Sequence, residues 1–532
     1  MNSAMEEVLQ LPNHQQLKHE FHDILFNSMI NPSVATDTTN ISIHYDDYNA
    51  LNPEEIKNLR RISTKLRSTD YFQDCFQIYI TTRKETVDRV FGQLHKKMNS
   101  ESVRVFAYWE DLSEKIGKWI QMVRICVENV FLPEKIFYEH IFGGSGAGED
   151  ADEGGYVHII GDSAAKLFDE FPDSLMSSGR RSSSSQILEI LLPVYQEFLN
   201  LMPVLEALFP EGLCLNKSIP DRASGTVCRL SRQIKRLIFA SERHVLRELS
   251  INTTPAGAVH PLTEYVINYI HLIFNYRKSL SDLIGEVKGS NDLIAAELDS
   301  LELEQDQSIP LKHHFTRIIE YLLYNLRYKS KFYDHESLRH LFMMNNVNHV
   351  AQKIGNSRGL HEIIGSVYLA KLRNKVKEYM TSYLKTTWNC VFLCLREEKS
   401  KRQGKWSSPF RNSNRDVKEK FKNFNLMIKN VHLRLDKLEV PDKHLRQKLC
   451  QSILINLIPA YRKFLAQHSR QIDKFQHPER YIKYSVKELE KEIMNLFSFK
   501  NQLKLQSIQA TGADENGSSM SMNTWMSNMF GD

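Results

Sequence analysis

The sequence has few cysteines and lacks a recognisable targeting or membrane-spanning segment. Its seven cysteines among 532 residues are odd in number and scattered, and most have apolar neighbours. This distribution argues against a disulfide framework and predicts buried thiols in a reducing compartment. The first thirty residues do not resemble a signal peptide, and no apolar run approaches the roughly 20 residues that span a bilayer. We therefore expect a cytoplasmic protein.

Motifs of catalysis and metal binding are also missing. The Gly-rich residues 143–148 precede acidic residues and not the Lys-Ser/Thr of a phosphate-binding loop, and His361 lacks the second histidine of a zincin helix. Cys390 and Cys394 have no two further ligands nearby in sequence, so we interpret them as packed in the core. The sequence predicts no enzyme, no cofactor and no metal site.

Strand-like alternation is scarce, whereas apolar residues recur at three- and four-residue spacing along most of the chain. Asn52 is placed to cap a helix that begins at Pro53. The longest apolar stripe predicts one helix over residues 366–397, about 48 Å long. Further stripes lie at Tyr71–Leu94, Val103–Ile141, Ile187–Leu208, Val227–Leu249 and Leu262–Ile284. These patterns predict an all-α fold, an elongated rod of stacked antiparallel helical bundles.

Breaks in composition predict the domain organisation. Residues 143–155 are rich in Gly and acidic, residues 286–309 are acidic, and residues 401–415 are basic and polar. We predict a partly helical leader over 1–48, an N-terminal helical bundle over 49–142, a middle bundle over 156–286, basic C-terminal bundles over 311–500 and a disordered tail over 509–532.

Two features of the predicted loops and tail suggest further roles. Ser182–Ser185 beside Arg180 and Arg181 form a candidate phosphorylation site in a Ser-rich loop, where added negative charge would switch a partner contact. Apolar residues interrupt the polar tail at Thr524–Phe530. That segment is either a docking peptide or an ordinary part of a disordered tail.

Charge is distributed unevenly along the chain. Residues 311–510 hold 39 Lys and Arg against 17 Asp and Glu, whereas residues 1–310 hold 30 against 44. The overall charge of +5 therefore combines an acidic first part with a strongly basic second part. This predicts that the C-terminal part meets a polyanion. No nucleic-acid-binding motif accompanies these cations, and they are not interleaved with a stacking platform, so nucleic acid is the weaker alternative.

The first candidate phosphate-binding segment lies near the end of the basic region. Arg480 and Lys483 stand three residues apart, beside Tyr481 and Tyr484. Two cations at this spacing in an exposed turn are suited to phosphate head groups. The alternative is ordinary surface charge, and the charge balance of the whole C-terminal region favours the functional interpretation.

A helix is predicted immediately after this turn. Ser485 and Glu488 fit a capping box, so the helix begins at Val486. The residues expected on its buried face are Val486, Leu489, Ile493 and Phe497.

A second candidate segment lies on the predicted long helix. Lys371 and Lys375 align at i and i+4, and Arg373 and Lys377 form a second row. The alternative is a solvated helix face, and this candidate is supported by charge alone.

Four stretches together resemble a known family. They are Ala258–Tyr269, His340–Val347, Leu457–Tyr461 and Tyr481–Val486. With them the chain resembles the plant branch of the seventy-kilodalton exocyst subunit family, over roughly residues 50–500. The resemblance implies an all-α rod without enzymatic activity, in a complex that holds secretory vesicles at the plasma membrane before fusion.

The resemblance also implies partners and site residues. In the family, two basic positions, one directly before the last stretch and one within it, take part in binding phosphatidylinositol 4,5-bisphosphate, and they fall on Arg480 and Lys483. Other exocyst subunits are expected partners. Because charge contacts alone support only reversible binding, a small GTPase or another exocyst subunit is expected as a second contact that assists recruitment from the cytoplasm to the plasma membrane. Family members usually carry a longer heptad-bearing region ahead of Met1. Its lack here motivates an alternative, a helical adaptor in immunity or autophagy that acts outside the exocyst.

Overall fold

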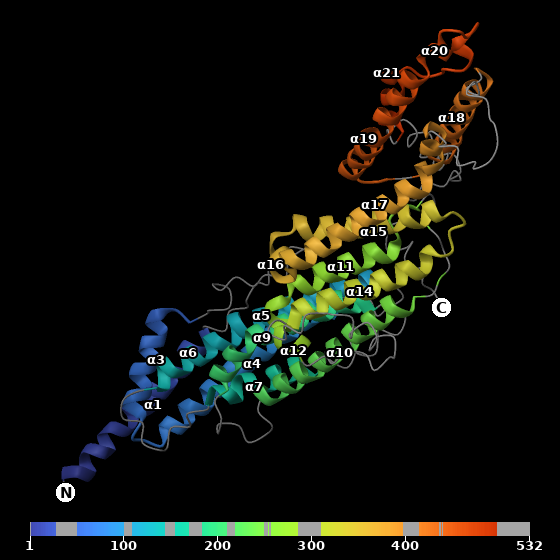
Figure 1. The fold of residues 1–532 in the computed structure, drawn as a ribbon. Coiled ribbons are helices and arrows are strands. Elements are labelled where there is room, and N and C mark those ends of the chain that lie inside the picture. Colours follow the sequence, from blue (N-terminus) through green and yellow to red (C-terminus); the bar gives the residue numbers. More distant parts are fainter. Residues whose placement is uncertain are drawn as a thin grey trace, which may run out of the picture. The chain divides into compact units, whose positions relative to one another are not determined.

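The computed structural model describes ten segments of the chain. They are residues 2–27, 51–99, 109–143, 155–169, 184–209, 219–248, 257–285, 310–396, 414–435 and 440–496, together with residues 250, 254 and 438. Within these segments every regular element is a helix, so the predicted all-α class is confirmed for them (Figure 1). The chain forms two compact units, Met1–Glu242 with Asn275–Ser290, and Arg243–Phe274 with Asn291–Asp532.

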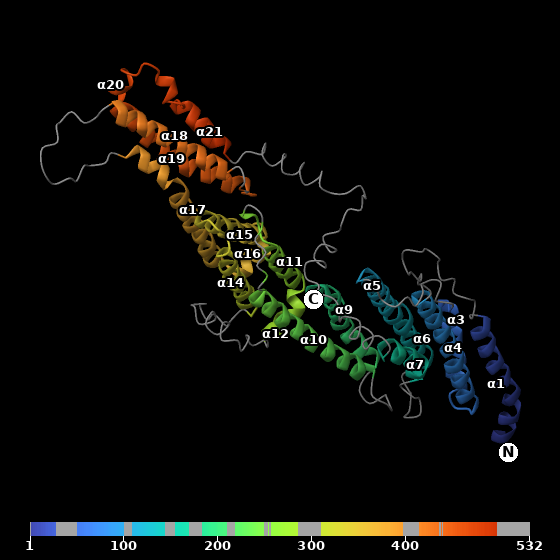
Figure 2. The same cartoon turned by 90° about the vertical axis from the view of Figure 1, so that its right-hand side faces the viewer.

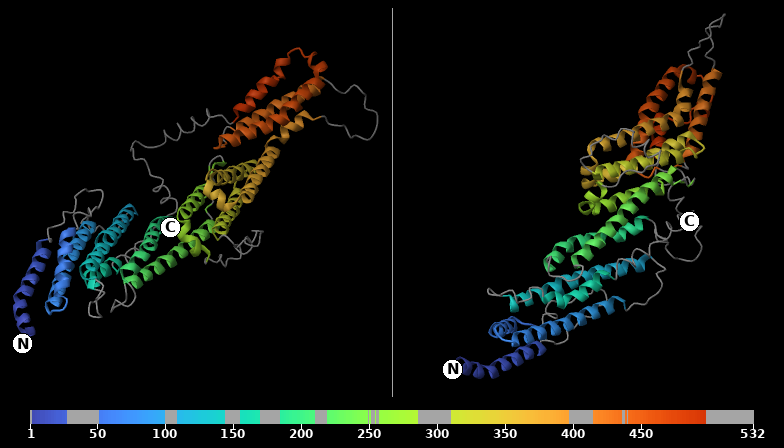
Figure 3. Two further views of the ribbon diagram at one scale, coloured as in Figure 1. Left: turned by 90° about the vertical axis from the view of Figure 1, so that its left-hand side faces the viewer. Right: turned by 90° about the horizontal axis from the view of Figure 1, so that it is seen from below.

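The first unit is built from helices that pack on one another. They are α1 (Asn2–Asn27), α3 (Pro53–Leu66), α4 (Tyr71–Asn99), α5 (Trp109–Ile125), a π-helix (Cys126–Phe131), α6 (Leu132–Phe142), α7 (Gly155–Asp169), α9 (Ser184–Leu208), most of α10 (Ile219–Arg247) and α12 (Arg277–Gly285). Helix α1 packs against α3 and α4, and α4 packs against α7 (Figure 3). The predicted leader therefore contributes a helix to this unit.

The start of α3 shows how closely the local sequence determines a helix boundary. The side chain of Asn52 accepts a hydrogen bond from the backbone N–H of Glu55 at 2.9 Å, and the Glu55 carboxylate accepts one from the N–H of Asn52 at 2.8 Å. Pro53 occupies the first turn, where its missing N–H costs nothing. The predicted cap and helix start are confirmed.

Among the ion pairs that join helices inside the first unit, two pair an arginine with a buried glutamate. Arg83 of α4 binds Glu134 of α6, and both side chains are almost completely buried. Arg124 of α5 binds Glu197 of α9 through two hydrogen bonds of 3.0 and 2.8 Å.

Among the described helices, α9 is the one long and apolar enough to cross a membrane. Half of its most apolar stretch is buried inside the unit, which favours a core helix.

The second unit contains the rest of the described helices. They are most of α11 (Pro261–Asn275), α14 (Pro310–Ser330), α15 (Glu336–Asn356), α16 (Arg358–Ile364), α17 (Ser366–Leu395), α18 (Asn414–Leu435), α19 (Lys443–Gln467), α20 (Ser469–Ile472), a 3-10 helix (Pro478–Arg480) and α21 (Val486–Asn495). Helix α17 connects two helical layers, because it packs against α15 and α16 and also against α18 and α19 (Figure 2).

Helix α17 confirms the long helix predicted over residues 366–397. It begins after Gly365, which has φ of +89° and separates it from α16, and it ends at Leu395. Its 30 residues correspond to about 45 Å. Glycine is favoured at position 365, because a side chain at such a positive φ is strained.

Two of the recognised sequence stretches meet in a buried polar network. The Oδ1 atom of Asn346 on α15 accepts hydrogen bonds from the N–H of His260 at 2.8 Å and from the hydroxyl of Thr263 at 2.6 Å. Its Nδ2 atom donates to the carbonyl of Phe342 at 2.8 Å. Asn346 is fully buried. The network therefore holds the beginning of α11 against α15.

Three details of the sequence prediction need correction. Cys390 is exposed and Cys394 is partly exposed, because the buried stripe of α17 runs through Trp388, Val391 and Leu395 instead. Ser184 and Ser185 belong to α9 and not to a loop. Val486 is only half-buried, whereas Leu489 and Ile493 are buried as predicted.

Other predictions concern residues outside the described segments. The residues outside these segments include Phe497, Arg180, Arg181, Ser182 and Ser183, the acidic region 286–309 and the tail 509–532. The five-part domain division stays a prediction.

Candidate functional site

The loop between α20 and α21 is anchored on both sides of Lys483. The side-chain amide of Asn425 on α18 donates to the carbonyl of Tyr481 at 2.7 Å, and the hydroxyl of Tyr461 on α19 donates to the carbonyl of Tyr484 at 2.8 Å. The sequence folds locally because Pro478 opens a short 3-10 helix, after which the Ser485–Glu488 capping box starts α21. The predicted capping box is confirmed, and it follows the loop directly.

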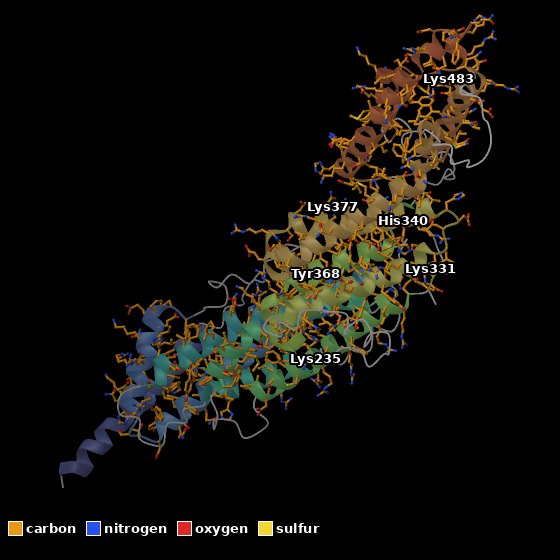
Figure 4. All side chains as sticks on the ribbon, viewed as in Figure 1. Lys235, Lys331, His340, Tyr368, Lys377 and Lys483 are labelled. Atoms are coloured by element: carbon orange, nitrogen blue, oxygen red, sulfur yellow. The ribbon has the colours of Figure 1, made fainter. Side chains whose placement is uncertain are left out.

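Arg480 and Lys483 project from this anchored loop into solvent. Both side chains are exposed, and within the described part of the chain neither forms an ion pair with a carboxylate. Figure 4 shows Lys483 in the part of the unit formed by α18 and α20. The structure therefore places both residues in the turn before α21, as the sequence predicted, with their charges accessible to a ligand.

Two further cations that sequence reasoning missed lie against the same loop. The Nζ atom of Lys418 on α18 lies 5.0 Å from the ring centroid of Tyr481 and 4.9 Å from that of Phe475. The Nζ atom of Lys422, one turn later, lies 5.7 Å from the Tyr481 ring. Such cation–π contacts contribute about 0.5–1 kcal/mol at exposed sites and position the ammonium groups.

We call Lys418, Lys422, Arg480 and Lys483 the basic cluster. Its members come from two segments that are distant in sequence, and Tyr481 joins them by contacting both lysines of α18. The only sequence signal for Lys418 and Lys422 was their i, i+4 spacing on a helix, which many solvated helices share.

The charge around the basic cluster is positive but not uniformly so. Residues 415–429 and 470–483 together contain nine Lys and Arg against four Asp and Glu. The pKa of Glu479 lies below its usual value, because its own backbone N–H, and then His477 and Arg480, favour the carboxylate. Glu479 therefore offsets part of the charge of Arg480, and the remaining surplus of cations can bind an anionic surface.

The second predicted segment divides into paired and free cations. Lys375 lies 3.3 Å from a carboxylate oxygen of Glu320 on α14, and Lys371 lies 3.7 Å from the other oxygen. The hydroxyl of Tyr368 donates to the same carboxylate at 3.0 Å. Burial lowers the pKa of Lys375 despite the carboxylate. Lys375 is therefore largely committed to an internal contact.

Arg373 and Lys377 remain exposed on α17. Figure 4 shows Lys377 well apart from Lys483 in this unit, so the two predicted segments do not form one site. The geometry favours the basic cluster, and Arg373, Lys377 and Lys371 stay a weaker candidate.

Comparison with known proteins gives a consistent result. The family described as the C-terminal part of the Exo70 exocyst complex subunit matches residues 117–495. The chain is 29% identical over 448 residues to exocyst complex component EXO70A1 of Arabidopsis thaliana and 28% identical over 458 residues to EXO70C2 of the same plant. These alignments cover 83% and 86% of this chain but 66% and 62% of the relatives, so the chain spans less than two thirds of either.

The fold is also similar to that of a solved structure. The structure of Exo70 from S. cerevisiae matches with a TM-score of 0.54 and 16% sequence identity, covering 92% of this chain and 88% of the yeast chain. At this identity the similarity concerns the fold alone. It agrees with the all-α class predicted from the sequence.

Proposed function

Because the chain belongs to the Exo70 family of exocyst complex subunits, we propose that it is a peripheral tether that docks secretory vesicles at the plasma membrane. Its C-terminal bundle binds phosphatidylinositol 4,5-bisphosphate through the basic cluster. The observation that carries this proposal is the pair of exposed cations, Arg480 and Lys483, on a loop anchored beside two further lysines. The protein acts by binding and not by catalysis, in keeping with a family described as subunits of a complex.

The membrane-binding free energy expected from the basic cluster is suited to reversible recruitment of the protein to the membrane. Each Lys or Arg near an anionic leaflet contributes roughly 1 kcal/mol. Four such contacts give about 4 kcal/mol, which corresponds to roughly a thousandfold partitioning. This supports recruitment from the cytoplasm that a second contact strengthens, such as another exocyst subunit or a small GTPase.

Co-sedimentation with liposomes tests the lipid site. We expect the protein to bind vesicles containing phosphatidylinositol 4,5-bisphosphate and the double variant Arg480→Glu/Lys483→Glu to lose roughly 90% or more of that binding. Neutralising the α18 lysines in Lys418→Ala/Lys422→Ala removes two contacts, so affinity falls roughly 30-fold at about 1 kcal/mol each.

A matched control separates the site from the net charge. Lys57 and Arg60 are exposed on α3 at the same three-residue spacing, and Lys57→Glu/Arg60→Glu changes the charge by the same amount. Equal loss in this control would show that only net charge matters. Loss confined to Arg373→Glu/Lys377→Glu would move the site to α17.

Assembly with other exocyst subunits is tested separately. The chain spans 66% of EXO70A1 and 62% of EXO70C2, so its assembly with the partners of a whole subunit is itself a proposal. We expect pull-down of the full chain from plant extract to recover other exocyst subunits. Recovery of none of them, with lipid binding intact, would favour the adaptor alternative.

A further inference from the structure

A shallow apolar groove lies between α19 and α21, apart from the basic cluster residues. Its volume is about 600 Å³, and its apolar lining comes mainly from Ile455, Ile458, Pro459 and Met494. Ile455 is 72% exposed and Met494 is 54% exposed. Large apolar side chains gathered at such exposure are typical of a docking surface.

The backbone of α19 offers a hydrogen-bond acceptor among the residues that line this groove. Pro459 lies inside α19 and has no N–H, so the carbonyl of Ile455 lacks the donor that residue i+4 supplies elsewhere in a helix. A ligand that brings an N–H or O–H donor to this carbonyl would supply the missing hydrogen bond.

The rim of the groove is basic. Arg462 pairs with Glu490 at 3.1 Å, and these two charges balance each other. Lys487 and Lys491 are exposed on α21 at i, i+4 spacing and line the same groove. The rim therefore carries two surplus positive charges and favours an acidic ligand.

One segment of this chain has these properties. Residues 505–532 contain no Lys or Arg, and their three acidic residues, Asp514, Glu515 and Asp532, flank the uncharged stretch 524–530. This segment contains two pairs of large apolar residues at i, i+4 spacing, Trp525 with Met529 and Met526 with Phe530. On a helix, residues at this spacing lie on one apolar face. The indole of Trp525 also supplies an N–H donor beside a large apolar ring.

The position of this segment in the chain allows it to reach the groove. Met494 lines the groove in the last turn of α21, and 29 residues separate it from residue 524. A coil of that length has a root-mean-square end-to-end distance of about 30 Å. A short connection of this kind gives an effective concentration in the millimolar range, so even weak docking is populated.

We propose that residues 524–530 dock into the α19–α21 groove of the same molecule, with their apolar face on Ile455 and Met494. The groove is then covered within the molecule, and any protein partner of this face has to displace the segment. The proposal is independent of lipid binding.

Photocrosslinking in the full chain tests this contact. Ile455 is replaced by p-benzoylphenylalanine in one protein and Val367 in another. Val367 is the matched control, since it is an apolar residue on a helix of the same unit and is 73% exposed. We expect the probe at 455 to crosslink residues 519–532 within one molecule, roughly fivefold or more above the probe at 367.

Two variants test the basis of the contact. Trp525→Ala/Phe530→Ala removes the apolar anchors and should reduce the crosslink to the level of the control. Lys487→Glu/Lys491→Glu reverses the rim and should reduce it severalfold at low salt. Crosslinked dimers would overturn the proposal in favour of a second copy of the chain. A tail crosslink no stronger than at position 367 would exclude the tail as occupant.

Discussion

Asn346 illustrates what a single buried amide does in this protein. It takes part in hydrogen bonds with His260, Thr263 and Phe342 and is fully buried. A buried donor or acceptor left without a partner costs about 1–3 kcal/mol, which exceeds the net contribution of an intact hydrogen bond. The polar residues of the two recognised stretches therefore stabilise the packing of α11 on α15.

Replacing Asn346 tests this role. Asn346→Ala leaves the N–H of His260 and the hydroxyl of Thr263 without their acceptor, so the unfolding free energy should fall by about 2–4 kcal/mol. Urea denaturation followed by tryptophan fluorescence measures the loss. Asn374→Ala, at an exposed position of α17, serves as control and should change stability by less than about 0.5 kcal/mol. Equal stability of the two variants would contradict the role of the network.

A buried ion pair at the end of α10 makes the stability of the fold depend on pH. Lys329 of α14 binds Glu248 and also donates to the carbonyl of Ser250 at 2.6 Å. Burial alone would raise the pKa of Glu248, but hydrogen bonds from Lys329 and Ser250 outweigh it and hold the pKa below the usual 4.5. A lowered pKa in the folded state means that the carboxylate stabilises the fold at pH above 4.5. That contribution is lost as the pH falls through the folded-state pKa.

Thermal melting across this pH range tests whether the contribution of Glu248 to stability falls as the pH falls. The difference in Tm between the wild type and Glu248→Gln should be largest above about pH 4.5 and shrink as the pH falls. Glu362→Gln is the control, because its carboxylate is exposed and pairs with an exposed Arg358. A Tm difference for Glu248→Gln that stays constant down to about pH 3 would rule out this linkage.

At the scale of the element, α21 is short and depends on its first turn. Its ten residues bury Leu489 and Ile493, and its first turn is held by reciprocal hydrogen bonds between Ser485 and Glu488. A helix of this length is marginal without tertiary contacts, so the capping box and the packing on α19 are both needed. The loop that carries Arg480 and Lys483 ends at this cap.

Removing the cap should loosen α21 without unfolding the protein. Ser485→Ala costs about 1 kcal/mol, so backbone amides in the first turn of α21 should exchange with solvent about fivefold faster. Hydrogen exchange with mass spectrometry measures this effect. Ser452→Ala on α19 is the control, because its hydroxyl only bonds the carbonyl of Lys448 in mid-helix and alanine is a better helix former. Unchanged protection in Ser485→Ala would show that packing alone holds α21.

At the scale of the whole molecule, the distribution of charge matters more than its sum. The overall charge is +5, yet residues 311–510 alone carry a surplus of 22 positive charges. Long-range attraction to an anionic surface is screened by salt, with a Debye length of about 10 Å at 0.1 M and about 3 Å at 1 M. The proposed membrane contact is therefore an electrostatic one.

Salt should weaken the proposed lipid binding steeply. Raising NaCl from about 0.1 to about 0.5 M should lower the partition coefficient on phosphatidylinositol 4,5-bisphosphate vesicles by more than about tenfold. Binding isotherms at several salt concentrations measure the slope. The Arg480→Glu/Lys483→Glu variant should show a flatter dependence, since fewer cations remain in contact. A wild-type affinity that does not change with salt would indicate an apolar contact with the bilayer instead.

Most of the secondary structure was predictable because its determinants are local. The caps at Asn52 and Ser485 and the uninterrupted stripe of α17 each depend on residues within a few positions of one another. Side chains at the edge of a stripe were less predictable. Cys390 stands between buried positions of α17, and only the actual packing shows that it faces outward.

The sequence by itself determined the helical class, the main helix starts, the basic character of the C-terminal region and the position of Arg480 and Lys483 before α21. These depend on periodicity, capping and composition, which neighbouring residues set. Only the tertiary structure decided that Lys418 and Lys422 join Arg480 and Lys483, whereas Lys375 is paired with Glu320. The partner of a charged side chain is chosen by how helices pack, and the spacing of residues along one helix does not contain that information.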